Sequence, residues 1–86
     1  MYIYETEKKS IFTEEGQEKF LDIRDQAKRL IERAGAFREN FISSSGSSWE
    51  TMACLDRLVE LKELVIVRDK GWRQYRVYST SETNNR

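Results

Sequence analysis

A change of hydrophobic period at Leu64 constrains this 86-residue chain more than any other feature. Before it, residues 48–62 place apolar side chains at helical spacing. After it, β-branched and aromatic residues dominate 65–78, on both sides of a charged, glycine-containing turn. Ser47 stands three residues before Glu50, which is the spacing of a capping box and predicts where the helix begins. The stretch therefore predicts an amphipathic helix that leads directly into a two-stranded hairpin.

A helical wheel over this stretch divides the side chains into two faces. The face that we expect to pack against another helix consists of Met52, Leu55, Leu58 and Val59. The opposite face, which we expect to lie outward, consists of Glu50, Ala53, Cys54 and Arg57. Burial of the first face would leave the second one accessible to a partner.

The strongest helical pattern of the chain lies between Gln17 and Ala34. Thr13 is a good N-cap residue and two glutamates follow it, but Gly16 weakens this first turn and favours a start nearer Gln17. Gly35 follows the last apolar residue, where glycine commonly ends a helix. We expect one apolar stripe of this helix to face the later helix. The stripe consists of Phe20, Ile23, Ala27, Leu30, Ile31 and Ala34.

Two shorter segments flank this long helix. Residues 1–5 are rich in β-formers and predict either a third strand beside the hairpin or a segment lying across the core, followed by a polar connector. Residues 36–42 predict a short second helix. Its inward-facing residues would be Phe37, Phe41 and Ile42.

The remaining two segments have polar compositions. Residues 43–48 contain five serines and one glycine, which predicts a flexible turn. Residues 79–86 contain no apolar side chain and predict a disordered tail. Residues 1–78 are short enough to form one domain with a single core.

The residue composition argues against most catalytic chemistry. The chain has no histidine, so the commonest general base and the commonest metal ligand are missing. The single cysteine, Cys54, allows neither an internal disulfide nor a cysteine-based zinc site. Its simplest interpretation is an inert thiol, with redox sensing as a remote alternative. Because the four glycines form no phosphate-binding pattern, we expect no enzyme activity, no metal and no cofactor.

Charge and hydropathy favour a cytoplasmic protein. Fifteen basic and fifteen acidic residues cancel, so strong general attraction to nucleic acid or to acidic membranes is not expected. No apolar run approaches the ~20 residues that a spanning helix needs. No signal-peptide pattern precedes Tyr2.

The residues SSWETMACLDRLVELKELVIVRDKGWRQYRVY resemble the winged helix-turn-helix superfamily, in the pattern of bacterial and phage regulators. The resemblance covers roughly residues 17–78. It rests on a serine-capped helix closed by leucines, a Val-x-Val strand, a charged turn and an aromatic-rich return strand. It implies an α+β fold of three helices with a C-terminal β-hairpin wing and possibly a short N-terminal strand. In that superfamily the third helix commonly enters the major groove of DNA, while the wing touches the backbone or the minor groove.

The resemblance also implies a partner, double-stranded DNA, and a role in transcription regulation. The helix residues that it places toward DNA are Ser47, Ser48, Glu50, Ala53 and Arg57. The wing residues that it places there are Arg68, Lys70, Trp72, Arg73 and Arg76. The helix face has no Asn or Gln to read adenine, whereas residues 65–86 carry five basic residues against two acidic ones. We therefore expect the wing to supply much of the affinity for DNA.

A second function stays open, namely a winged-helix module that binds another protein as an adaptor or inhibitor. Trp72, in the turn, could stack on a nucleic-acid sugar, fill a pocket of a partner or fold back on its own domain. Trp49 would most simply staple the first turn of its helix to Phe37 or Phe41. A continuous positive face over the helix and the wing would favour DNA. A mixed face with exposed aromatic side chains would favour a protein partner.

A homodimer is a further expectation. Tyr2 and Tyr4 are spaced for one face of a strand and could form its edge. Winged helices often dimerise through added terminal elements, so this contact is compatible with the resemblance.

Overall fold

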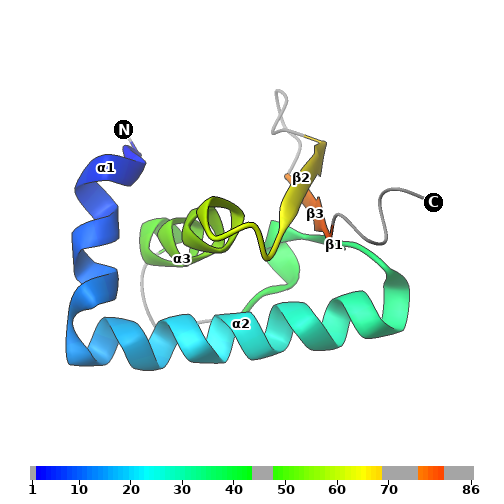
Figure 1. The fold of residues 1–86 in the computed structure, drawn as a ribbon, viewed down its shortest axis with the longest axis horizontal. Coiled ribbons are helices and arrows are strands. Elements are labelled where there is room, and N and C mark those ends of the chain that lie inside the picture. The colour runs from blue at the N-terminus through cyan, green and yellow to red at the C-terminus, as the bar shows by residue number, and fades with distance from the viewer. Residues whose placement is uncertain (1, 44–47, 69–75, 81–86) are drawn as a thin grey trace.

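The computed structural model describes residues 2–43, 48–68 and 76–80 (Figure 1). They form an α+β fold, which is the class predicted from the sequence. The helices, 3₁₀ helices (η) and strands are, in chain order, α1 (Tyr4–Glu7), η1 (Lys8–Phe12), α2 (Glu14–Ala34), β1 (Phe37–Arg38), η2 (Glu39–Phe41), α3 (Ser48–Glu60), β2 (Val65–Arg68) and β3 (Val77–Ser79).

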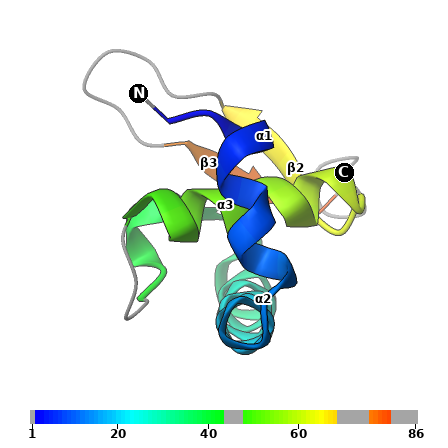
Figure 2. The same cartoon turned by 90° about the vertical axis from the view of Figure 1, so that its left-hand side faces the viewer.

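The helices enclose α3 from more than one side. α2 runs along the length of the molecule, and α3 packs against it (Figure 1). α1 and η1 turn away from the N-terminal end of α2 and pass across α3 (Figure 2). The small sheet lies beside the C-terminal end of α3, from which the chain leads into β2 (Figure 1). α3 is therefore a central helix of this fold.

α2 has the capping residues that the sequence predicts at both ends. The Thr13 hydroxyl accepts a hydrogen bond from the Gly16 amide at 3.0 Å, and Gly35 ends the helix in the left-handed conformation with φ 79°. The helix begins at Glu14, earlier than the predicted start near Gln17. A Cβ atom on Gly16 would lie 1.8 Å from the Ser10 carbonyl oxygen, so glycine is needed here for close packing of η1.

The sheet is antiparallel with the strand order β1-β3-β2. The predicted hairpin is present, because Ile66 of β2 is paired with Tyr78 of β3. The helix predicted over 36–42 is wrong: Phe37 pairs with the other side of Tyr78, and a 3₁₀ turn follows it. A pairing partner so far along the chain leaves no local pattern from which β1 could be predicted.

Of the two alternatives for residues 1–5, the strand is wrong, whereas a segment lying across the core is confirmed, because Tyr2 and Tyr4 pack against it. α1 begins at Tyr4, and α1 and η1 together occupy the stretch predicted as a connector. Ile11 of η1 is only 2% exposed, which anchors the segment to the core. The third strand of the sheet is β1.

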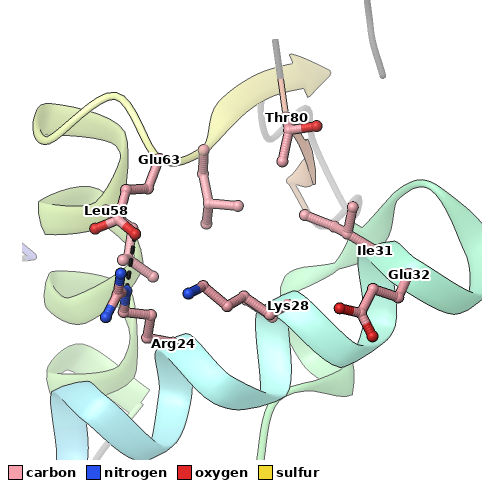
Figure 3. A pocket seen from close by; sticks show the side chains of 9 residues that line it. Arg24, Lys28, Ile31, Glu32, Leu58, Glu63 and Thr80 are labelled. Carbon is pink, nitrogen blue, oxygen red and sulfur yellow. Dashed lines mark hydrogen bonds and ion pairs between the residues drawn. The ribbon is translucent and has the colours of Figure 1, made fainter. Parts of the chain in front are cut away.

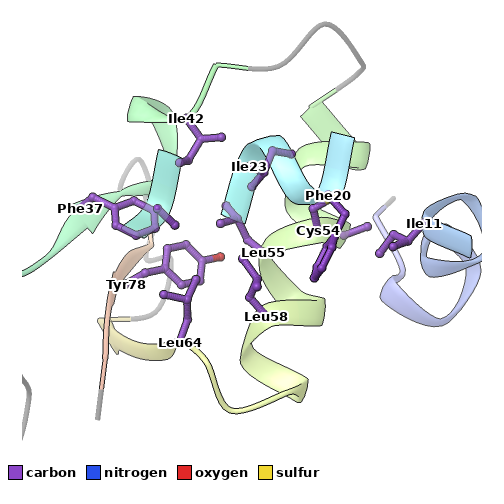
Figure 4. Close-up of a cluster of buried hydrophobic side chains, with 12 residues drawn as sticks. Ile11, Phe20, Ile23, Phe37, Ile42, Cys54, Leu55, Leu58, Leu64 and Tyr78 are labelled. Carbon is purple, nitrogen blue, oxygen red and sulfur yellow. The ribbon is translucent and has the colours of Figure 1, made fainter. Parts of the chain in front are cut away.

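The core lies between α2, α3, η1 and the sheet (Figure 4). Leu55 and Leu58 are buried as predicted, while Met52 and Val59 are half-buried. Phe37 stacks on Tyr78 with 5.5 Å between ring centroids. The buried residues are Ile11, Phe20, Ile23, Ala27, Phe37, Ile42, Ala53, Cys54, Leu55, Leu58, Leu64 and Tyr78.

Three residues differ from their expected surroundings. Phe41, which was predicted to point inward, is 53% exposed, and Ala34 at the end of α2 is also exposed. Ser79 was predicted to begin a disordered tail, but it belongs to β3 and is only 2% exposed. Its hydroxyl donates to the Gly35 carbonyl oxygen at 2.6 Å, which ties the end of β3 to the end of α2. The rest of the predicted tail from 81 onward, and 44–47 of the serine-rich turn, lie outside the described residues.

Candidate nucleic-acid interface

Asp56 of α3 forms hydrogen bonds with groups from two other segments. Its carboxylate accepts a hydrogen bond from the Tyr2 hydroxyl at 2.6 Å and one from the Arg76 guanidinium at 2.9 Å. The Asp56 and Arg76 side chains are only 16% and 22% exposed. Tyr2 and Arg76 therefore cover Asp56 on α3.

Glu60, one turn further along α3, forms a second cluster. Its carboxylate accepts from the Tyr4 hydroxyl at 2.9 Å and from the Arg57 guanidinium at 2.5 Å. The hydrogen bonds from Arg57 and then from Tyr4 hold the pKa of Glu60 below its ordinary value. The Arg57 guanidinium also lies 5.3 Å from the centre of the Phe12 ring. The one arginine predicted to read DNA from this helix is thus paired with Glu60 and lies over the Phe12 ring of η1.

Glu50 is turned toward α2. The Lys19 ammonium group lies 2.8 Å from the Glu50 carboxylate, in an ion pair whose side chains are about one third exposed (30% and 34%). Its predicted capping partner, Ser47, lies outside the described residues. This ion pair fixes the N-terminal part of α3 on α2.

Ala53 and Cys54 are buried, and the prediction that they face outward is wrong. Their exposed fractions are 0% and 3%. The wheel assumed that only one side of α3 would be covered, whereas α2 and η1 cover it from two sides. Side chains this small allow the neighbouring segments to approach the helix closely. Neither residue is placed to contact DNA.

Burial raises the pKa of the Cys54 thiol from its ordinary 9.0 to about 11, and burial likewise raises the pKa of Tyr78 to about 12. The neutral forms are favoured in the folded state, so their contribution to stability is complete below pH 9 and is lost as the pH rises from about 9 to 12. We expect the urea midpoint to fall over that interval and to be insensitive to these groups between pH 7 and 9. In Cys54→Ala the fall should begin near pH 10, where tyrosine starts to ionise. A midpoint that stays constant through pH 11 would contradict the burial of both groups.

The predicted wing residues are described only in part. Arg76 is half-buried and paired with Asp56, so the root of the wing is joined to α3. Lys70, Trp72 and Arg73 lie outside the described residues, in the connection between β2 and β3. For Ser48 and Arg68 the structure describes the backbone alone, at the start of α3 and the end of β2.

Trp49 is 41% exposed at the first turn of α3. A staple to Phe37 or Phe41 would bury the indole ring, and Phe41 is itself exposed. This interpretation of Trp49 is therefore not supported. Trp49 is instead a large aromatic side chain available at the surface.

Sequence reasoning missed the role of Tyr2, Tyr4 and Asp56 in closing the face of α3. The two tyrosines were interpreted as a dimer edge, but their hydroxyls are used within the chain. Their partners lie more than fifty positions away (54 and 56), so no local spacing could reveal them. The one available signal was the small apolar pair Ala53 and Cys54 on a face expected to be polar.

In the part of the chain that the structure describes, no three or more metal-binding side chains come together. Within the same residues, no helix is both long and apolar enough to cross a membrane. Comparisons with protein-family models, with curated proteins and with solved structures found no match for this chain.

Proposed function

We propose that this chain is a winged-helix protein that binds double-stranded DNA through its wing, the β2–β3 hairpin with the residues between them. The observation that carries this proposal is the arrangement of the hairpin. It follows α3 directly, pairs with β1 in the order β1-β3-β2, and is joined to α3 at its root by the Arg76–Asp56 ion pair. This arrangement is compatible with a winged helix. A regulatory role in transcription is the function that the resemblance then favours.

The side of α3 that carries Asp56, Arg57 and Glu60 does not contribute to DNA binding in this proposal. The Arg57 charge is balanced by Glu60, and Asp56 and Glu60 would bring two carboxylates toward the phosphates if the tyrosines were displaced. Carboxylates repel the phosphate backbone, and a covered helix cannot enter a groove. Major-groove readout by Glu50, Ala53 and Arg57 is therefore not part of the proposed mechanism.

The basic residues of the wing supply the attraction. Lys70 and Arg73 stand in the connection between β2 and β3, and Arg68 ends β2. Contacts of this kind go to phosphates, so they position a protein on a duplex without reading its sequence. We expect weak binding, with a dissociation constant on the order of 10⁻⁶ to 10⁻⁴ M and little preference among sequences.

The salt dependence of binding tests this mechanism. Fluorescence anisotropy with a mixed-sequence duplex, measured over a series of salt concentrations, gives the slope of log K against log salt. The double variant Lys70→Ala/Arg73→Ala should bind more weakly and reduce the slope by about 2, because two phosphate contacts are lost. The matched control Arg57→Ala removes one cation from α3 and should leave the slope unchanged. A slope that responds to Arg57→Ala and not to the wing variant would contradict the proposed interface, and no binding at micromolar protein in low salt would contradict the function.

One observation favours docking to another protein as a second candidate. Trp49 is exposed at the start of α3, and tryptophan is enriched among the residues that dominate protein interfaces. The Arg57–Glu60 and Arg76–Asp56 pairs also give this side of the helix both positive and negative charges. Under this function Trp49→Ala should abolish capture of the partner while any affinity for DNA stays unchanged. Retained capture by this variant would count against it.

A further inference from the structure

A pocket of about 510 Å³ opens between α2, the C-terminal end of α3 and the residue that follows β3 (Figure 3). None of its lining residues is among the wing residues proposed to contact DNA, so it is considered independently of that function. Its volume falls within the range of small-molecule sites. Its lining residues are Arg24, Ala27, Lys28, Ile31, Glu32, Leu58, Glu63, Leu64 and Thr80.

The apolar surface of the pocket is formed largely by buried side chains of the core. Ala27, Leu58 and Leu64 are 2%, 1% and 4% exposed, and Ile31 is half-buried beside them. All four side chains are aliphatic, and none of the described lining residues offers an aromatic ring on which a flat ligand could stack. An alkyl chain is the apolar group that this surface suits best.

The charged residues of the pocket differ in whether they are paired. The Arg24 guanidinium lies 2.8 Å from the Glu63 carboxylate, which holds the end of the helix–strand connection on α2 and balances both charges. Lys28 projects over the opening between this pair and Ile31 (Figure 3). Among the described residues, its ammonium group has no hydrogen-bond or ion-pair partner.

Glu32 lies one turn further along α2 and also lines the pocket, but it forms no ion pair with Lys28. No ion pair joins the two side chains among those found in the described residues. A lysine that precedes a glutamate by four residues is also the less favourable orientation for pairing along a helix. The pocket thus combines an aliphatic surface with one cation available to an anion.

We propose that this pocket binds a small alkyl carboxylate, with the alkyl chain on Ala27, Ile31, Leu58 and Leu64 and the carboxylate on the Lys28 ammonium group. The apolar surface supplies most of the affinity, and the ammonium group selects a carboxylate over a neutral head group. Because Lys28 is exposed, its ion pair with the ligand carboxylate contributes modestly to the affinity. We expect the pocket to prefer a carboxylate over a neutral head group by about fivefold.

Octanoate and octanamide, which share an alkyl chain and differ in the charge of the head group, test this proposal on the full chain. In amide chemical-shift titrations at millimolar ligand, octanoate should shift the amides of Ala27, Ile31 and Leu64 and should bind about fivefold more tightly than octanamide. In Lys28→Met the two ligands should bind equally. The matched control Lys9→Met changes an exposed lysine outside the pocket and should preserve the difference.

Three results would overturn the proposal. The first is equal binding of octanoate and octanamide by the natural chain. The second is a fivefold preference for octanoate that survives in Lys28→Met. The third is a set of shifted amides elsewhere in the molecule, or no shift at all at 10 mM ligand, a concentration about tenfold above the dissociation constant on the order of 1 mM expected for a ligand of this size.

Discussion

Gly16→Ala is expected to destabilise the fold by about 2–3 kcal/mol, although the same substitution inside an ordinary helix stabilises it by about 1 kcal/mol. The reason is the close approach of η1 to the first turn of α2. A Cβ atom at this position would lie 1.8 Å from the Ser10 carbonyl oxygen and 2.8 Å from the Ile11 Cα atom, which are both backbone atoms. Relief of this clash requires η1 to move, and that movement would withdraw Ile11 from the core.

Urea unfolding followed by circular dichroism measures this effect. Glu18→Ala is the matched control, because it lies on an exposed position of the same helix and should change stability by less than about 0.5 kcal/mol. If Gly16→Ala were as stable as the natural chain, η1 could not be packed on α2 as described. The contacts of η1 with α3 would then also be wrong.

Leu55→Ala is the second large effect, with an expected loss of about 2–5 kcal/mol from lost burial and the cavity left behind. Leu55 is 0% exposed and lies on the side of α3 that faces the core. For a domain whose total stability is about 5–15 kcal/mol, this loss is a large fraction. Leu21→Ala removes the same atoms from a side chain that is 52% exposed, and it should cost much less. Equal urea midpoints for these two variants would show that Leu55 is not buried in the core.

The sequence predicted the elements whose signals are local. Thr13 and Gly35 mark the ends of α2 because capping depends on neighbouring residues only. The change of period at Leu64 locates the boundary between α3 and the hairpin for the same reason. The start of α2 was predicted too late because the propensity of Gly16 was considered without its contact to Ser10.

The elements that were predicted incorrectly depend on distant partners. Tyr4 lies in a helix because α1 packs on α3 and its hydroxyl reaches Glu60, not because of its β-forming neighbours. Phe37 is in a strand because β3 is available to pair with it. Composition and periodicity within each segment cannot report such contacts, which decide the outcome for short segments of weak intrinsic preference.

The covering of α3 could not be predicted from local patterns. The sequence suggests that this helix is poorly equipped to read bases, which stays a prediction. It did not reveal that Tyr2, Tyr4 and Phe12 contact Asp56, Glu60 and Arg57 on this helix. A helix that is apolar on more than one side is generally buried, and the sequence Met52 to Leu55 has this character.

In the proposed complex, DNA meets the wing and not the side of α3 that carries Asp56, Arg57 and Glu60. Amide chemical shifts of the ¹⁵N-labelled chain, recorded as a short mixed-sequence duplex is added at low salt, test it residue by residue. The largest changes should fall on residues 68–76, while the amides of Ala53, Asp56, Arg57 and Glu60 should change little. Large shift changes at these four α3 residues, with no changes at residues 68–76, would show that DNA contacts the helix. This result would contradict DNA binding through the wing.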